Sequence, residues 1–133
     1  PASVAPAPDI VVGDMSFISL TLVLPALVAA AAPDADFLLM VKPQFEIGKE
    51  RLGHGGVVRN PEHHVETVEN VARCAIGLGL DIAAIAPSPL PGPSGNVEYF
   101  LYMRRDYPEP INPQELTDYI RAAVAEGPAG GAL

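Results

Sequence analysis

Three polar residues stand at the ends of apolar runs, and their types are those that handle protons. Asp14 follows Ile-Val-Val-Gly, Lys42 follows Phe-Leu-Leu-Met-Val, and Glu98 precedes Tyr-Phe-Leu-Tyr-Met. Such apolar runs predict buried strands, and the crevice at one rim of an α/β sheet is a common place for a site. We therefore predict that the aspartate, the lysine and the glutamate meet at one rim and form a proton-handling cluster.

Each residue also has an ordinary structural explanation. Asp14 would cap a strand-to-helix junction, Lys42 would extend its charged end from a strand end into water, and Glu98 would face solvent on an edge strand. Taken singly, each residue favours that explanation. Their joint placement at one predicted rim, together with the family resemblance given below, favours catalysis.

Length and composition indicate one folded domain. The chain has 133 residues, of which 49% are hydrophobic, and this is enough for a core. The single cysteine, Cys74, excludes an internal disulfide and fits a buried core position in a reducing compartment. Residues 1–8 resemble a flexible linker and not a signal peptide. We therefore expect a cytoplasmic protein.

The charge pattern argues against a chain that holds nucleic acid by itself. The net charge is −8, whereas phosphate binding relies on clustered cations. Residues 42–59 are nevertheless locally basic and rich in glycine, which predicts a mobile loop above the sheet rim that touches a phosphate or closes on a substrate. An ordinary solvated loop is an equally weighted alternative. The basic residues of this segment are Lys42, Lys49, Arg51 and Arg59.

Apolar periodicity and turn signals predict an α/β chain. Helices are expected at 19–32, 61–78 and from 112 to about 127, with strands at 9–14, 37–42, 81–87 and 97–103. The last two strands are joined by a short Pro- and Gly-rich segment that leaves no room for a crossover helix. They should form an antiparallel hairpin at the end of an otherwise parallel, doubly wound sheet.

The predicted sheet looks incomplete. The strand at 9–14 is apolar and carries no lysine or proline that would protect an edge, so another strand should lie beside Ile10–Val12. No glycine-rich turn with a phosphate or cofactor fingerprint occurs in the sequence. These features predict half of a nucleotide-binding domain.

Four motifs resemble one family. Asp-Met-Ser-Phe-Ile-Ser-Leu, Val-Lys-Pro-Gln-Phe-Glu-Ile-Gly, Gly-Gly-Val-Val-Arg-Asn-Pro and Ser-Pro-Leu-Pro-Gly-Pro-Ser-Gly-Asn-Val-Glu-Tyr-Phe-Leu are similar, in this order, to the TlyA proteins. These are FtsJ-like ribosomal RNA 2′-O-methyltransferases that are often labelled haemolysins. The resemblance covers residues 9–105 and implies the C-terminal half of a Rossmann-like methyltransferase fold, incomplete here, with a mostly parallel sheet and an antiparallel last strand. Residues 106–133 would add an amphipathic helix and a tail.

The resemblance also implies a mechanism and partners. Family members use a Lys-Asp-Lys-Glu tetrad with S-adenosyl-L-methionine, and Asp14, Lys42 and Glu98 match its last three members. The first lysine, the glycine-rich donor loop and the S4-like RNA-binding domain have no counterpart. Expected partners are ribosomal RNA or a ribosomal subunit and a missing N-terminal half of the same enzyme, with a homodimer through the open sheet edge as an alternative.

Neighbouring residues receive supporting roles from the same resemblance. Asp14, Phe17 and Ser94 are expected at the cofactor, and substrate contacts are expected from Ser16, Lys49, Arg51, Arg59 and Asn96. For the loop before Glu98, ordinary turn chemistry is the alternative. Lys42 would either accept the proton of the ribose hydroxyl or stay cationic and stabilise the developing alkoxide, with the two carboxylates orienting it.

Other functions are less favoured by the sequence. His54, His63 and His64 lack a carboxylate or thiol partner at ligand spacing, so no metal site is expected. The run from Ser16 to Ala32 falls short of the roughly 20 apolar residues that span a bilayer, so no membrane role is expected in spite of the haemolysin label. A non-catalytic fragment that only binds RNA or a partner remains the alternative to an enzyme.

Overall fold

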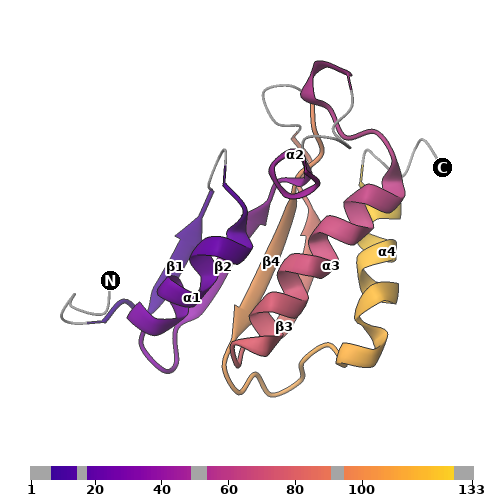
Figure 1. Ribbon diagram of the computed structural model, residues 1–133. Helices are drawn as coiled ribbons and strands as arrows, with labels where there is room; N and C mark the ends of the chain where they lie inside the picture. Colours follow the sequence, from indigo (N-terminus) through magenta and orange to yellow (C-terminus); the bar gives the residue numbers. More distant parts are fainter. Residues whose placement is uncertain (1–6, 15–17, 49–53, 91–94, 128–133) are drawn as a thin grey trace.

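The computed structural model describes residues 7–14, 18–48, 54–90 and 95–127 of the chain. Figure 1 shows strands backed by helices, with most helices along one side of the sheet. The elements are β1 (Ile10–Gly13), α1 (Leu20–Ala30), β2 (Asp36–Val41), α2 (Pro43–Glu46), the 3-10 turn η2 (His54–Gly56), α3 (Pro61–Gly77), β3 (Asp81–Pro87), β4 (Tyr99–Arg104), the 3-10 turn η3 (Pro113–Glu115) and α4 (Leu116–Glu126).

The described strands form one mixed sheet in the order β1-β2-β4-β3. β1 and β2 are parallel, and β4 is antiparallel to both β2 and β3. The predicted antiparallel hairpin at the end of the sheet is therefore confirmed, and within this hairpin β4 lies inside the sheet while β3 forms the edge. The physical reason lies in the side chains: β4 is half-buried or buried along its whole length, whereas β3 presents exposed Ala84 and Ala86.

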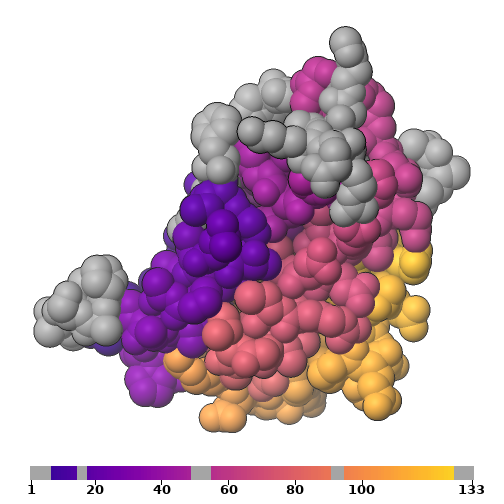
Figure 2. Space-filling view, in the orientation of Figure 1, coloured from indigo at the N-terminus to yellow at the C-terminus, as the bar shows by residue number. Residues whose placement is uncertain are grey.

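The core lies between the sheet and the helices. Along β2, Phe37, Leu39 and Val41 are fully buried, while Leu38 on the opposite face is 41% exposed. This is the alternation of a strand that is covered on one face. The covering layer is built by α1, α3 and α4, which lie next to one another in Figure 2. Its fully buried members include Leu24, Val68, Val71 and Ile120.

α1 and α3 begin where the sequence predicts, whereas the helix predicted from 112 begins as η3 and continues as α4 from Leu116, and α2 was not predicted. Ser19 caps α1 by accepting a hydrogen bond from the Thr21 amide at 3.1 Å. Asn60 caps α3 in the same way, with the Glu62 amide at 2.9 Å and Pro61 in the first turn. α1 continues through its internal proline at position 25. Cys74 is a half-buried free thiol packed at the margin of the core.

The opposite face and the β1 edge of the described sheet are uncovered. Ile10 is 63% exposed and Val12 72% exposed, and β1 pairs only with β2 among the described strands. β1 is therefore an apolar edge strand without protective charges, as the sequence predicts. Together with Leu38, these side chains form what we call the open face.

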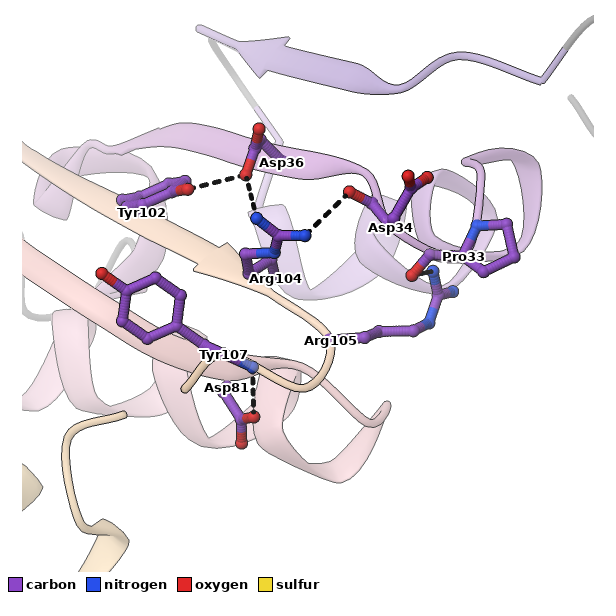
Figure 3. Close-up of polar contacts among 8 residues, drawn as sticks. All are labelled: Pro33, Asp34, Asp36, Asp81, Tyr102, Arg104, Arg105 and Tyr107. Atoms are coloured by element: carbon purple, nitrogen blue, oxygen red, sulfur yellow. Dashed lines mark hydrogen bonds and ion pairs between the residues drawn. The ribbon is translucent and has the colours of Figure 1, made fainter. Parts of the chain in front are cut away.

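A polar cluster fixes the end of the sheet where β2 begins (Figure 3). Arg105 follows β4 and donates hydrogen bonds to the carbonyls of Val28 and Ala32 at 2.9 and 3.0 Å, which places a cation at the C-terminal end of α1. The Tyr102 hydroxyl donates to Asp36 at 2.6 Å. These contacts join α1, β2 and β4 at this end of the sheet. Asp14, Lys42 and Glu98 lie at the opposite end.

Candidate active site

The structure brings Asp14, Lys42 and Glu98 to one end of three neighbouring strands. Asp14 directly follows β1 and Lys42 directly follows β2, two parallel strands that end at the same rim. Glu98 directly precedes β4, whose first residue Tyr99 pairs with Val41, the last residue of β2. One further step in this antiparallel register sets Lys42 beside Glu98.

The polar contacts agree with this placement. The Lys42 ammonium forms an ion pair with the Asp14 carboxylate. Lys42 is 9% exposed and Glu98 5% exposed, whereas the side chain of Asp14 is 60% exposed. The amine and the inner carboxylate are therefore largely removed from water, and the outer carboxylate meets solvent. This burial excludes the alternatives in which Lys42 extends into water and Glu98 faces solvent on an edge strand.

All three side chains have the strand parity of the open face. Val41 and Tyr99 point into the core. Their neighbours Lys42 and Glu98 therefore point to the opposite face, because successive side chains of a strand alternate between faces. Asp14 follows the buried Gly13, where a Cβ atom would lie 2.7 Å from the side chain of Leu39. Glycine at this position therefore lets β1 approach β2 closely. The three side chains therefore lie on the same side of the sheet as the open face, where α2 contributes Gln44 next to Glu98.

Two residues of the rim escaped the sequence analysis. Gln44 donates from Nε2 to Oε2 of Glu98 at 3.2 Å. Glu46 accepts from the Ser19 hydroxyl at 2.5 Å and from the Leu20 amide at 2.8 Å, at the N-terminus of α1. Burial raises the pKa of Glu46, and these two hydrogen bonds oppose the rise. Both residues lie in the Val-Lys-Pro-Gln-Phe-Glu-Ile-Gly motif of the family resemblance, which was the signal for them, but no role was assigned to either.

Asn96 is built into the fold of the rim. It is buried, with 1% of its surface exposed. Both polar atoms of the side-chain amide bond to the segment before α3: Oδ1 accepts from the Val58 amide at 2.8 Å, and Nδ2 donates to the Gly56 carbonyl at 2.9 Å. Both ends of the side chain therefore hold the loop. The predicted substrate contact by Asn96 is untested, but in this structure its amide has structural partners.

The buried His64 holds the same segment from α3. Its Nε2 lies 2.8 Å from the Val58 carbonyl oxygen and its Nδ1 lies 2.8 Å from the hydroxyl oxygen of Tyr99. Burial lowers the pKa of His64 and raises that of Tyr99 above its usual range. Together with Asn96, His64 fixes the segment that leads to Arg59, which is exposed.

Several predicted contacts lie outside the described residues. Of the other residues predicted to contact cofactor or substrate, only Arg59 is described; Ser16, Phe17, Lys49, Arg51 and Ser94 are not. Within the described ranges, no group of three or more His, Cys, Asp or Glu side chains could hold a metal ion. No helix in the same ranges is both long and apolar enough to cross a membrane.

The chain is an α/β protein with a mixed sheet, an antiparallel inner strand, and a lysine paired with a carboxylate at the rim. The family model for FtsJ-like methyltransferases matches residues 2–105. The chain belongs to the FtsJ-like methyltransferase family. The predicted fold class and the family resemblance are thereby confirmed.

Curated relatives and solved structures agree with this membership. The 16S/23S rRNA (cytidine-2′-O)-methyltransferase TlyA of Mycobacterium tuberculosis is 48% identical over 128 residues, which are 96% of this chain and 48% of that protein. Hemolysin A of Brachyspira hyodysenteriae is 28% identical over 71% of this chain and 40% of its own length. A solved structure from Streptococcus thermophilus, described as a candidate hemolysin, has a TM-score of 0.77 at 33% identity and covers 90% of this chain and 44% of that one. The chain thus spans about half the length of the curated relatives it matches.

Proposed function

We propose that this chain forms the proton-handling part of a methyltransferase that modifies a ribose 2′-hydroxyl of ribosomal RNA. The observation that carries the proposal is the meeting of Asp14, Lys42 and Glu98 at one rim, with Lys42 paired to Asp14. The name of the mycobacterial relative, an rRNA (cytidine-2′-O)-methyltransferase, supports this reaction and this substrate. We assign the catalytic role to these three residues.

The rim suits a positively charged methyl donor. Asp14, Glu98 and Lys42 together have a formal charge of −1, and the Asp14 carboxylate is exposed to an incoming group. S-adenosyl-L-methionine, when bound, supplies an electrophilic methyl group on a cationic sulfur. Asp14, Phe17 and Ser94 are our proposed contacts to it. Of these, Asp14 is the member whose surroundings the structure describes.

The buried amine would act on the attacking oxygen. Lys42 either takes the proton of the 2′-hydroxyl or, as the ammonium, stabilises the alkoxide that develops during attack while water takes the proton. The ion pair with Asp14 favours the second role, because the ammonium is the form that makes the pair. Glu98, buried beside Lys42, would orient the amine, and alignment of this kind is a large part of catalysis in displacement reactions.

The RNA would be held by exposed cations near the rim. Arg59 is exposed at the end of the segment that His64 and Asn96 fix, and its side chain suits a phosphate contact. Ser16, Lys49 and Arg51 are proposed for the same surface. Lys42 does not belong to it, because it is buried.

A transfer assay tests the proposed function. The whole protein that contains this chain is incubated with ribosomal RNA and S-adenosyl-L-methionine carrying a labelled methyl group, and the labelled 2′-O-methyl nucleotide is counted. Lys42→Ala should lower the rate by roughly 100- to 10,000-fold. The control Arg73→Ala removes an exposed cation on α3 and should leave the rate unchanged. Equal rates for wild type and Lys42→Ala would contradict the assignment.

We further propose that the open face is covered by the remaining half of the same methyltransferase. The relatives are about twice as long as this chain, the exposed side chains are apolar, and the proposed catalytic rim has the same strand parity. Burial of one valine or isoleucine stabilises an interface by about 1.5–3 kcal/mol. Completion of this face would therefore bring the two halves together at the site.

A charge on the open face tests this partner. Val12→Lys should weaken association between this chain and the remaining half by at least about tenfold, measured by titration calorimetry with the two purified parts. Leu22→Lys is the control, since Leu22 is 71% exposed on α1, away from the sheet. A stable homodimer of this chain that Val12→Lys dissolves would instead support pairing of two β1 edges.

A further inference from the structure

The segment Lys42–Glu46 connects the rim to three different elements. Lys42 pairs with Asp14 at the end of β1, Gln44 bonds to Glu98 at the start of β4, and Glu46 bonds to the N-terminus of α1. A single helical turn provides this spacing: the Phe45 amide donates to the Lys42 carbonyl at 3.0 Å. Pro43 in the first turn fixes its own φ and stiffens the start.

The orientation of the Gln44 amide is fixed by Glu98. Its Nε2 lies 3.2 Å from a carboxylate oxygen that can only accept while ionised. Turning the amide over would set its oxygen against that carboxylate, and two acceptors repel each other. The donor end must therefore face Glu98, which is 5% exposed and has little water to replace this bond.

This orientation has a cost that is visible in the structure. Gln44 Oε1 is buried and has no hydrogen-bond partner in the described part of the chain. An orphaned acceptor is unfavourable for folding. An apolar side chain of the same shape would remove this orphan, but it would also take away the bond that Gln44 donates to the buried Glu98 carboxylate.

We infer that Gln44 is a positioning residue for the reaction, which rests on the proposed function. It holds the Glu98 carboxylate in the orientation that lets this group direct the Lys42 amine. Because Gln44 is two residues from Lys42 on a stiff turn, one short segment sets both the amine and the carboxylate that orients it. Its contribution lies in the alignment of Glu98, and not in contact with the reacting atoms.

Gln44→Met tests the inference because it keeps the shape and removes the hydrogen bond. In the whole protein, kcat should fall about 10- to 100-fold, the size expected when a catalytic group is displaced by about 1 Å. KM for RNA should stay within about twofold. The midpoint of thermal unfolding should fall, because the buried Glu98 carboxylate loses its bond to Gln44, so kcat is compared at a temperature at which both proteins are folded. Gln114→Met, at an exposed position on η3, is the matched control and should change nothing.

Gln44→Glu adds a readout that a structural role would not move. The introduced carboxyl group repels Glu98 when ionised but donates to it when protonated. The rate of this variant relative to wild type should therefore rise as pH falls from 8 to 6. A flat ratio, or a Gln44→Met variant with normal kcat beside an inactive Lys42→Ala variant, would overturn the inference and leave the proposed function standing. A wild type without any transfer would refute the proposed function itself.

Discussion

Replacement of His64 should both weaken the fold and remove a specific pH dependence. His64 is 1% exposed and lies between the Val58 carbonyl oxygen and the Tyr99 hydroxyl, each at 2.8 Å. The carbonyl only accepts, so Nε2 carries the proton and Nδ1 accepts from the Tyr99 hydroxyl. The neutral ring thus satisfies both partners in one tautomer, which is assigned from this network.

The sign of the pH dependence follows from the direction of the pKa shift. Burial is the main cause that lowers the pKa of His64, the bond to the Val58 carbonyl opposes the shift, and the nearby His63 adds to it. Below the ordinary value of about 6.5, the unfolded chain takes up a proton that the folded chain refuses. The contribution of His64 to stability is therefore complete above about pH 6.5 and decreases as pH falls, by up to about 1.4 kcal/mol per pH unit until the folded pKa is reached.

His64→Phe keeps a ring and deletes both hydrogen bonds. The Val58 carbonyl and the Tyr99 hydroxyl are then left buried without this partner, and each orphan costs about 1–3 kcal/mol, so the free energy of unfolding at pH 7.5 should fall by about 2–6 kcal/mol. Urea unfolding between pH 5 and 8 measures both effects. His63→Phe, a change to the half-buried neighbour, is the control and should be closer to wild type.

The slope of the free energy of unfolding against pH distinguishes this explanation from a simple packing defect. The His64→Phe variant should lose the part of the slope below pH 6.5 that His64 contributes, in addition to its lower stability. A variant that is destabilised but keeps the full wild-type slope would refute the claim that His64 is held neutral by its two partners.

Two further predictions concern contacts at opposite ends of the sheet. Asn96→Ala should free the segment before α3, because Asn96 bonds to both the Val58 amide and the Gly56 carbonyl; hydrogen exchange at the Val58 amide should speed up at least about tenfold, and unchanged protection would contradict this role. Arg105→Met should lower the free energy of unfolding by about 1–3 kcal/mol, since the cation bonds to carbonyls at the C-terminal end of α1, including that of Val28. Urea unfolding beside Arg73→Met, an exposed control, measures the second effect.

Local patterns were enough to find the strands and the residues at their ends. Asp14 and Lys42 follow continuous apolar runs, and parallel strands separated by a helix end at the same rim, so their convergence could be predicted from the sequence. Glu98 could be added because the loop before it is too short for a crossover helix. Each of these arguments uses neighbours along the chain.

The support around these residues depends on contacts that no local pattern specifies. Gln44 and Glu98 are 54 residues apart, and Glu46 and Ser19 are 27 apart. Neither spacing has a period or a motif that marks it. The sequence analysis did not order β3 and β4 within the hairpin for a similar reason, since the choice between an inner and an edge position depends on how deeply each strand is buried against other elements.

The distribution of burial separates stability from activity in this chain. On the helix-covered face, Leu39 and its neighbours are fully buried, so the core of this part is complete without further elements. On the open face, Val12 and Leu38 are exposed, and the proposed catalytic side chains share the parity of that face. Substitutions toward the helices should therefore act mainly on folding. Those toward the open face should act mainly on the proposed assembly and on the proposed catalysis, because the proposed catalytic side chains share the parity of that face.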